Sequence, residues 1–137
     1  KIAARGGNYL LNIAPKPDGT FPEASIQRLE EIGKWMKVNG EAIYGTKASP
    51  LPSLPWGECT MKQHKNSAIL YLSVFNWPSE GKLLIPGLVN QVSSVKLLSS
   101  GRKLKSDPVS EGLIIQAPDT IATVIVLKVK GLVNYEL

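Results

Sequence analysis

The feature that most constrains the fold is a repeated strand-and-turn pattern that begins near residue 58. From there, short apolar runs are separated by turn-forming residues at intervals of roughly eight to twelve residues. Within residues 67–75, one face of the expected strand carries Ala68, Leu70, Leu72 and Val74. This pattern predicts an antiparallel β-sandwich of seven or eight strands. The expected strands are 58–63, 67–75, 82–85, 92–98, 102–105, 113–116 and 121–130.

The first part of the chain, residues 1–46, predicts one strand followed by one helix. Residues 9–14 form an apolar run without strict alternation, which is typical of a parallel strand covered on both faces. Such a strand needs a neighbour at each edge, and the chain offers no second parallel strand with a crossover helix. With no initiator Met at Lys1, this indicates a piece of a longer protein.

The expected helix follows a break at residues 15–19. Thr20 and Glu23 have the spacing of a capping box, with Pro22 in the first turn. Asn39 and Gly40 are typical of a left-handed helix stop. Apolar residues recur at helical spacing and form one stripe: Ile26, Leu29, Ile32, Gly33 and Met36.

These patterns divide the chain into three parts. Residues 1–46 are the strand-helix unit, residues 47–59 a proline-rich extended linker, and residues 60–137 the sandwich. A complete (β/α)₈ barrel needs about 250 residues. The 137 residues of this chain cannot form one.

Composition excludes several classes of function. Lys and Arg number 16 against 11 Asp and Glu, but they are scattered, and the one dense cluster is Arg102, Lys103 and Lys105. No aromatic-rich basic motif accompanies it, so we expect no nucleic-acid partner. No apolar stretch is long enough to cross a membrane as a helix. One cysteine, Cys59, and one histidine, His64, exclude a disulfide framework and most metal sites and catalytic triads.

Acid-base catalysis requires a pair of positioned carboxylates or a carboxylate with a histidine. Asp18, Asp107 and Asp119 each stand beside Gly or Pro, where Asp normally caps its own backbone in a turn. Glu41 and Glu58 have no evident carboxylate partner. The residues themselves therefore predict no active site, catalytic residue or metal site.

Three aromatic residues allow two interpretations. Trp56, Tyr71 and Trp77 form either a platform that stacks on sugar rings or ordinary interface and core residues. The first interpretation predicts a carbohydrate-binding module, and the second is compatible with a subunit-interaction module.

A long motif in the first part resembles a known enzyme family. Residues 6–15 (GGNYLLNIAP), 18–20 (DGT) and 29–46 resemble the last βα unit of glycoside hydrolase family 29, the α-L-fucosidases. Ala14 stands where this family usually has Gly. Residues 72–78, 81–88 and 121–127 resemble the C-terminal β-sandwich of the same family. The expected fold is therefore mostly β: an antiparallel sandwich preceded by one βα unit from the end of a (β/α)₈-like barrel.

The resemblance implies a parent enzyme that hydrolyses terminal α-L-fucosyl linkages with retention. In such enzymes an Asp nucleophile and a second carboxylic acid, often Glu, act without metal or organic cofactor. The two carboxyl groups of a retaining glycosidase lie about 5–5.5 Å apart. The resemblance places both upstream of residue 1, so the isolated chain is expected to be inactive.

The resemblance also implies a candidate substrate contact. In a barrel the carboxyl end of each strand faces the ligand. Asn12 and Asp18 lie at the corresponding strand end and loop, so they either form part of the pocket rim or merely close the barrel. The implied partners are fucosylated glycans and the missing N-terminal barrel. Without that barrel the edges of residues 9–13 are unpaired, so this segment either pairs with another copy of the chain or is abandoned as a strand, with the helix packing on the sandwich. Family members are commonly periplasmic or secreted in bacteria and lysosomal in animals.

Overall fold

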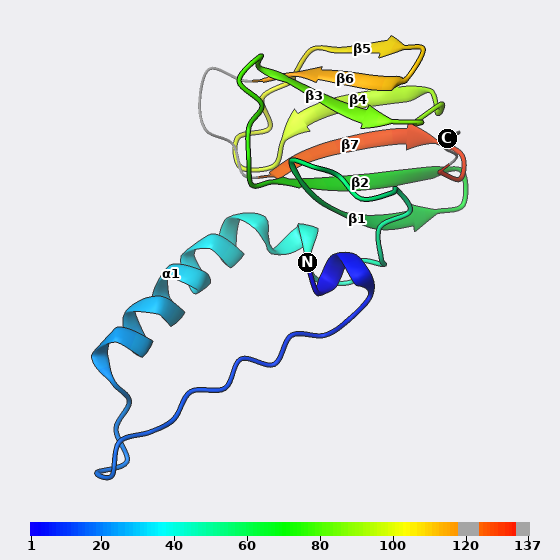
Figure 1. Cartoon of the computed structure of the whole chain (residues 1–137). Helices are drawn as coiled ribbons and strands as arrows, with labels where there is room; N and C mark the ends of the chain where they lie inside the picture. The colour runs from blue at the N-terminus through cyan, green and yellow to red at the C-terminus, as the bar shows by residue number, and fades with distance from the viewer. Residues whose placement is uncertain (118–123, 134–137) are drawn as a thin grey trace.

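The computed structural model describes residues 1–117 and 124–133. Figure 1 shows a β-sandwich at one end and a helix, α1 (Glu23–Asn39), extending away from it. The chain runs from a short 3₁₀ helix, η1 (Ala3–Arg5), out to a turn and returns through α1 to a second one, η2 (Gly40–Ala42). No helix in the described ranges is long and apolar enough to cross a membrane.

Seven described strands form two antiparallel sheets, which confirms a mostly β fold. The larger sheet has the strand order β1-β2-β7-β4, and the smaller has the order β3-β6-β5. The strands of the larger sheet are β1 (Gly57–His64), β2 (Ser67–Val74), β7 (Val124–Lys130) and β4 (Val92–Leu97). Those of the smaller sheet are β3 (Lys82–Pro86), β6 (Gly112–Gln116) and β5 (Ser106–Val109).

The main core lies between the two sheets. The predicted alternation along β2 is present, and its face of alternate residues from Ala68 to Val74 packs in this core. Seven further core residues come from four other strands of both sheets: Leu83, Ile85, Leu97, Ile115, Ile125, Leu127 and Val129.

One expected strand is wrong. Residues 102–105 form no strand and make only a single bridge, between Lys103 and Lys96. The strand lies later, at β5, and it contains Asp107 and Pro108, so Asp107 is not in a turn. Proline lacks the donor that a central strand needs, but β5 pairs with β6 alone, and an edge strand tolerates it.

Both predicted helix caps are also wrong. The residue before α1 is Pro22, whose ring has no hydrogen-bonding group, and the Thr20 N–H that a capping box pairs with Glu23 donates to Asp18 instead. Gly40 has a right-handed φ of −59°, so α1 continues into η2 rather than stopping. The positive φ expected at Gly40 occurs five residues later, at Gly45, with φ +67°.

Residues 9–14 are not a strand in the described structure. Tyr9 is 68% exposed and Leu10 is 91% exposed, because the described chain places no second strand beside them. The apolar stripe of α1 is also partly open, with Ile32 at 45% exposure. Only the C-terminal end of α1, through Trp35, packs against the sandwich.

Candidate functional site

The candidate rim is a closed turn at residues 16–20. The Gly19 N–H donates to the Lys16 carbonyl at 2.9 Å, and the Lys16 N–H donates to the Thr20 carbonyl at 2.7 Å. Pro17 supplies the fixed φ that suits the second position of such a turn, and Gly19 takes φ +81°. The sequence Lys-Pro-Asp-Gly-Thr therefore folds locally into a defined turn without help from the sandwich.

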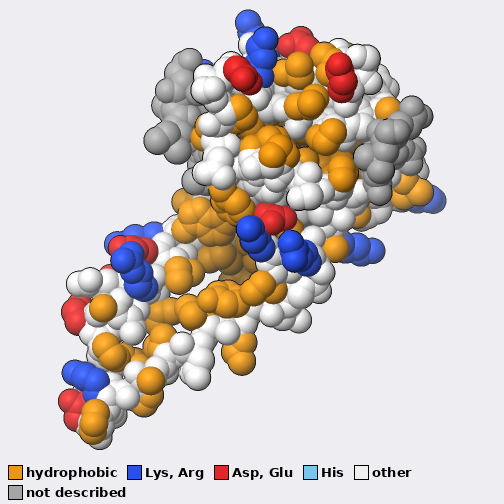
Figure 2. Space-filling model, in the orientation of Figure 1, with side chains coloured by type: hydrophobic (Ala, Val, Ile, Leu, Met, Phe, Trp, Pro, Cys, Tyr) orange, Lys and Arg blue, Asp and Glu red, His pale blue; other side chains and the backbone are white. Residues whose placement is uncertain are grey.

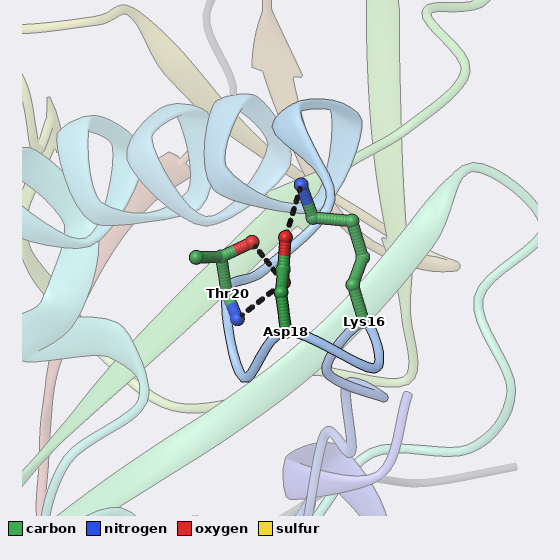
Figure 3. Close-up of polar contacts among 3 residues, drawn as sticks. All are labelled: Lys16, Asp18 and Thr20. Carbon is green, nitrogen blue, oxygen red and sulfur yellow. Dashed lines mark hydrogen bonds and ion pairs between the residues drawn. The ribbon is translucent and has the colours of Figure 1, made fainter.

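Asp18 is held within this turn. Its Oδ1 accepts hydrogen bonds from the Thr20 N–H at 2.9 Å and the Thr20 hydroxyl at 2.7 Å, and its Oδ2 lies 3.9 Å from Lys16 Nζ (Figure 3). The hydrogen bond from the Thr20 hydroxyl lowers the pKa of Asp18 below its ordinary value. Asp18 is therefore an oriented, ionised and exposed carboxylate, suited to accepting hydrogen bonds from ligand hydroxyl groups.

Asn12, the other candidate, lies on the extended segment that leads to the turn. Its side chain is exposed. The structure does not join it to Asp18 through a hydrogen bond. The extended segment and the turn both lie on the part of the molecule that extends away from the sandwich (Figure 1), but the two candidates form no hydrogen-bonded pair in this chain.

Three other carboxylates form hydrogen bonds or ion pairs, in each case with a side chain that is not a carboxylate. Glu41 accepts from the Tyr71 hydroxyl at 2.6 Å, Asp107 accepts from Gln116 at 3.2 Å, and Glu31 pairs with Arg28. Asp119 lies outside the described residues. In residues 1–117 and 124–133, no group of three or more His, Cys, Asp or Glu side chains could hold a metal ion.

Cys59 is buried, whereas His64 is exposed. Cys59 is 1% exposed, and burial raises the pKa of its thiol to about 12. At neutral pH it is therefore a protonated core residue rather than a nucleophile. His64 ends β1 on the exposed surface.

The proposed aromatic platform is not assembled. Trp56 is 4% exposed and its indole N–H donates to the Leu84 carbonyl at 2.9 Å, while Tyr71 is fully buried. Trp77 is half-buried and packs against the main core. Neither Trp56 nor Tyr71 can stack on a sugar, so the core interpretation is correct for both.

A groove of about 790 Å³ lies beside β4 and β5. Serines such as Ser93, Ser106 and Ser110 line it together with apolar residues such as Leu88 and Leu113. Among the residues that the structure describes, its lining includes neither a carboxylate nor an aromatic side chain. These described residues therefore do not supply the carboxyl pair that glycoside hydrolysis requires.

One contact was predicted only in outline: the helix was expected to pack on the sandwich if residues 9–13 form no strand, and η2 with the end of α1 packs on the outer face of the larger sheet. The Thr60 hydroxyl donates to the Ala42 carbonyl at 2.6 Å, beside the Tyr71–Glu41 hydrogen bond. The available signal was the pair of polar groups, Thr60 and Tyr71, at outward positions of two neighbouring strands. Outward polar positions ordinarily face water, so this signal alone does not identify a partner.

Comparison with known proteins gives a consistent family. The family model described as alpha-L-fucosidase matches residues 1–41. Tissue alpha-L-fucosidase of Bos taurus is 34% identical over 123 residues, which cover 82% of this chain and 24% of that protein. The chain belongs to the α-L-fucosidase family. Plasma alpha-L-fucosidase of Rattus norvegicus, another member, is 36% identical over 121 residues, covering 82% of this chain and 26% of that protein.

Solved α-L-fucosidase structures share the fold. A glycoside hydrolase family 29 enzyme from Bacteroides thetaiotaomicron, trapped as a covalent intermediate, superposes with a TM-score of 0.85 at 26% identity. That match covers 93% of this chain and 30% of the other. A bacterial fucosidase with an inhibitor gives a TM-score of 0.87 at 26% identity, over 96% of this chain and 30% of the other. The chain thus spans about a quarter of the length of the curated relatives it matches.

Proposed function

We propose that this chain is the C-terminal part of a longer retaining α-L-fucosidase, which hydrolyses terminal α-L-fucosyl linkages of glycoconjugates. The observation that carries the proposal is the family match over residues 1–41 together with relatives that align across 82% of the chain. In this proposal residues 1–46 are the last βα unit of a (β/α)₈ catalytic barrel. The linker is the segment before β1, and the C-terminal sandwich begins at Gly57, three residues earlier than the boundary expected at residue 60.

Exposed apolar surface supports the barrel unit. Figure 2 shows hydrophobic side chains gathered on the part of the molecule that extends away from the sandwich. Leu10 is 91% exposed and Leu29 is 39% exposed, although both belong to patterns typical of buried faces. An N-terminal barrel would supply neighbouring strands for residues 9–14 and apolar cover for α1. That barrel is the partner that the proposal requires.

The proposed chemistry proceeds through a covalent glycosyl-enzyme. A carboxylate attacks the anomeric carbon while a second carboxylic acid protonates the departing oxygen, and water then releases fucose with the original configuration. A trapped covalent intermediate in the family 29 relative supports this course. Both carboxyl groups are assigned to the preceding part of the longer enzyme. This chain contributes the exposed carboxylate of Asp18, and the side chain of Asn12, at the pocket rim.

Hydrolysis of aryl glycosides by the longer enzyme tests the proposed activity. We expect release of the aryl group from an α-L-fucoside and negligible release from an α-D-galactoside, which serves as the matched control substrate. Absence of α-L-fucoside hydrolysis by the folded longer protein would contradict the proposal.

The rim role of the turn predicts a kinetic effect in the longer enzyme. Replacement of residues 15–19 by a Gly-Ser loop of equal length removes the Pro17 and Asp18 constraints. We expect kcat/KM for an aryl α-L-fucoside to fall about tenfold, because misplacement of a pocket wall disturbs substrate orientation.

The control replaces the two exposed turn residues Lys65 and Asn66 by Gly-Ser, which should leave kcat/KM unchanged. If both replacements leave the kinetics unchanged, Asn12 and the turn only close the barrel.

A further inference from the structure

The outer face of the larger sheet carries a second, smaller core. Tyr71 of β2 and Val124 and Val126 of β7 pack there against Ala42 of η2, with Trp35 of α1 at the margin. Ala42 and Tyr71 are both fully buried. The outer face of the larger sheet is therefore covered here by η2 and the end of α1.

Two hydrogen bonds cross this contact, and both reach η2. The Tyr71 hydroxyl donates to Glu41 Oε1 at 2.6 Å, and the Thr60 hydroxyl donates to the Ala42 carbonyl at 2.6 Å. The Lys62 ammonium lies 5.4 Å from the centroid of the Tyr71 ring, within the range of a cation–π interaction. Burial and the carboxylate of Glu41 raise the pKa of Tyr71, so its hydroxyl remains a donor.

α1 is followed directly by η2, with no left-handed residue between them. The Gly40 N–H still bonds to the Met36 carbonyl, so α1 and η2 form a continuous helical path. Asn39, which joins the two, is 4% exposed and donates to the Trp35 carbonyl at 3.2 Å. The hydrogen bonds that hold η2 in place therefore also restrict the direction of α1.

We propose that Tyr71 and Thr60 form a latch on Glu41 and Ala42 that fixes the direction in which α1 leaves the sandwich. Given the proposed function, the latch also makes Tyr71 a positioning residue for the turn at residues 16–20. A helix of 17 residues is about 25 Å long. A tilt of about 10° at η2 would displace its far end, next to the turn, by about 4 Å.

Hydrogen-deuterium exchange on the 137-residue chain tests the latch without any reference to catalysis. Tyr71→Phe keeps the buried ring and removes only the hydroxyl. We expect amides of residues 36–46 to exchange about fivefold faster, as for the loss of one hydrogen bond. Amides of β1 and β2 should be unchanged. Tyr9→Phe removes an exposed hydroxyl and is the matched control, with no change expected at either place.

Substitutions of Glu41 separate the hydrogen bond from simple loss of packing. Glu41→Gln keeps an acceptor for Tyr71 and should exchange like the parent chain. Glu41→Ala should exchange at least as fast as Tyr71→Phe, because it leaves the buried Tyr71 hydroxyl unpaired. The double variant Tyr71→Phe/Glu41→Ala should show no further increase, because both changes remove one interaction. Additive effects, or equal acceleration throughout β1 and β2 in Tyr71→Phe, would overturn the latch.

Kinetics of the longer enzyme test the positioning role. Tyr71→Phe should lower kcat/KM for an aryl α-L-fucoside about threefold. Glu41→Gln, which keeps the hydrogen bond, is the control and should have normal kcat/KM. Tyr9→Phe is not used in this experiment, because Tyr9 lies in the proposed barrel unit. Faster exchange in residues 36–46 with unchanged kcat/KM would overturn the positioning role. If the longer protein has no fucosidase activity, the proposed function fails, and the exchange experiment still decides the latch.

Discussion

The purified 137-residue chain should leave an aryl α-L-fucoside unhydrolysed. Retaining hydrolysis requires two carboxyl groups about 5–5.5 Å apart, one on each side of the scissile bond. Asp18, Glu41 and Asp107 are each bonded to a hydroxyl or amide group instead. Relative to the longer enzyme, we expect a loss of at least about 10⁶-fold in rate, since that is the lower end of enzymatic acceleration.

The measurement is release of the aryl group at high protein concentration, with the longer enzyme as positive control. Circular dichroism of the same sample should show its β structure, so that an unfolded sample is not mistaken for an inactive one. Hydrolysis that co-purifies with the folded chain and is lost in Asp18→Asn would contradict the assignment of the catalytic pair to another part of the enzyme.

Trp56→Ala should lower the free energy of unfolding by about 3–5 kcal/mol, the range for removal of a buried aromatic side chain. Trp56 immediately precedes β1 of the larger sheet, and its indole N–H donates to Leu84 in β3 of the smaller sheet. It therefore fills the main core and joins the two sheets. The change should appear as a shift in the midpoint of urea unfolding followed by circular dichroism.

Trp56→Phe is the matched control, because it keeps an aromatic ring but loses the bond to the Leu84 carbonyl. We expect a cost of about 1–3 kcal/mol, chiefly from the unpaired carbonyl. Neither variant should change binding to a fucosylated glycan. A small stability change with loss of glycan binding in both variants would restore the sugar-platform interpretation.

The sandwich could be predicted from sequence because its strands carry strong local patterns. Within β2, the predicted alternation is present, and the alternate residues Ala68 to Val74 face the main core. The position of β5 could not be predicted, because Pro108 argues against a strand unless the strand is known to lie at an edge. Edge position depends on the pairing of distant strands, which local sequence does not specify.

The turn at residues 16–20 was predictable for the same local reason. Asp beside Gly was expected to cap its own backbone, and Asp18 does so by accepting from the Thr20 N–H. In the proposed capping box the Glu23 carboxylate would accept from the Thr20 N–H, but the Asp18 carboxylate accepts from that N–H instead. Which of two nearby carboxylates accepts from a given N–H depends on the folded geometry, and sequence spacing alone does not decide it.

Packing of the helix on the sandwich was one of two expectations, but the residues that make the contact through η2 could not be predicted. Glu41 and Tyr71 are 30 residues apart, and Ala42 and Thr60 are 18 apart. Neither pair has a sequence signature, because each partner is an ordinary residue until the fold brings it to the other. The apolar segment at residues 9–14 shows the opposite case: its pattern is clear, but its expected strand partners are not in the described chain.

The stereochemistry of hydrolysis by the longer enzyme tests the central claim most directly. Proton NMR can follow the anomer of fucose released from an aryl α-L-fucoside before mutarotation equilibrates the two forms. A retaining α-L-fucosidase should release the α anomer first, with the β anomer appearing later. Initial release of the β anomer, or no release of fucose by the folded enzyme, would contradict the account.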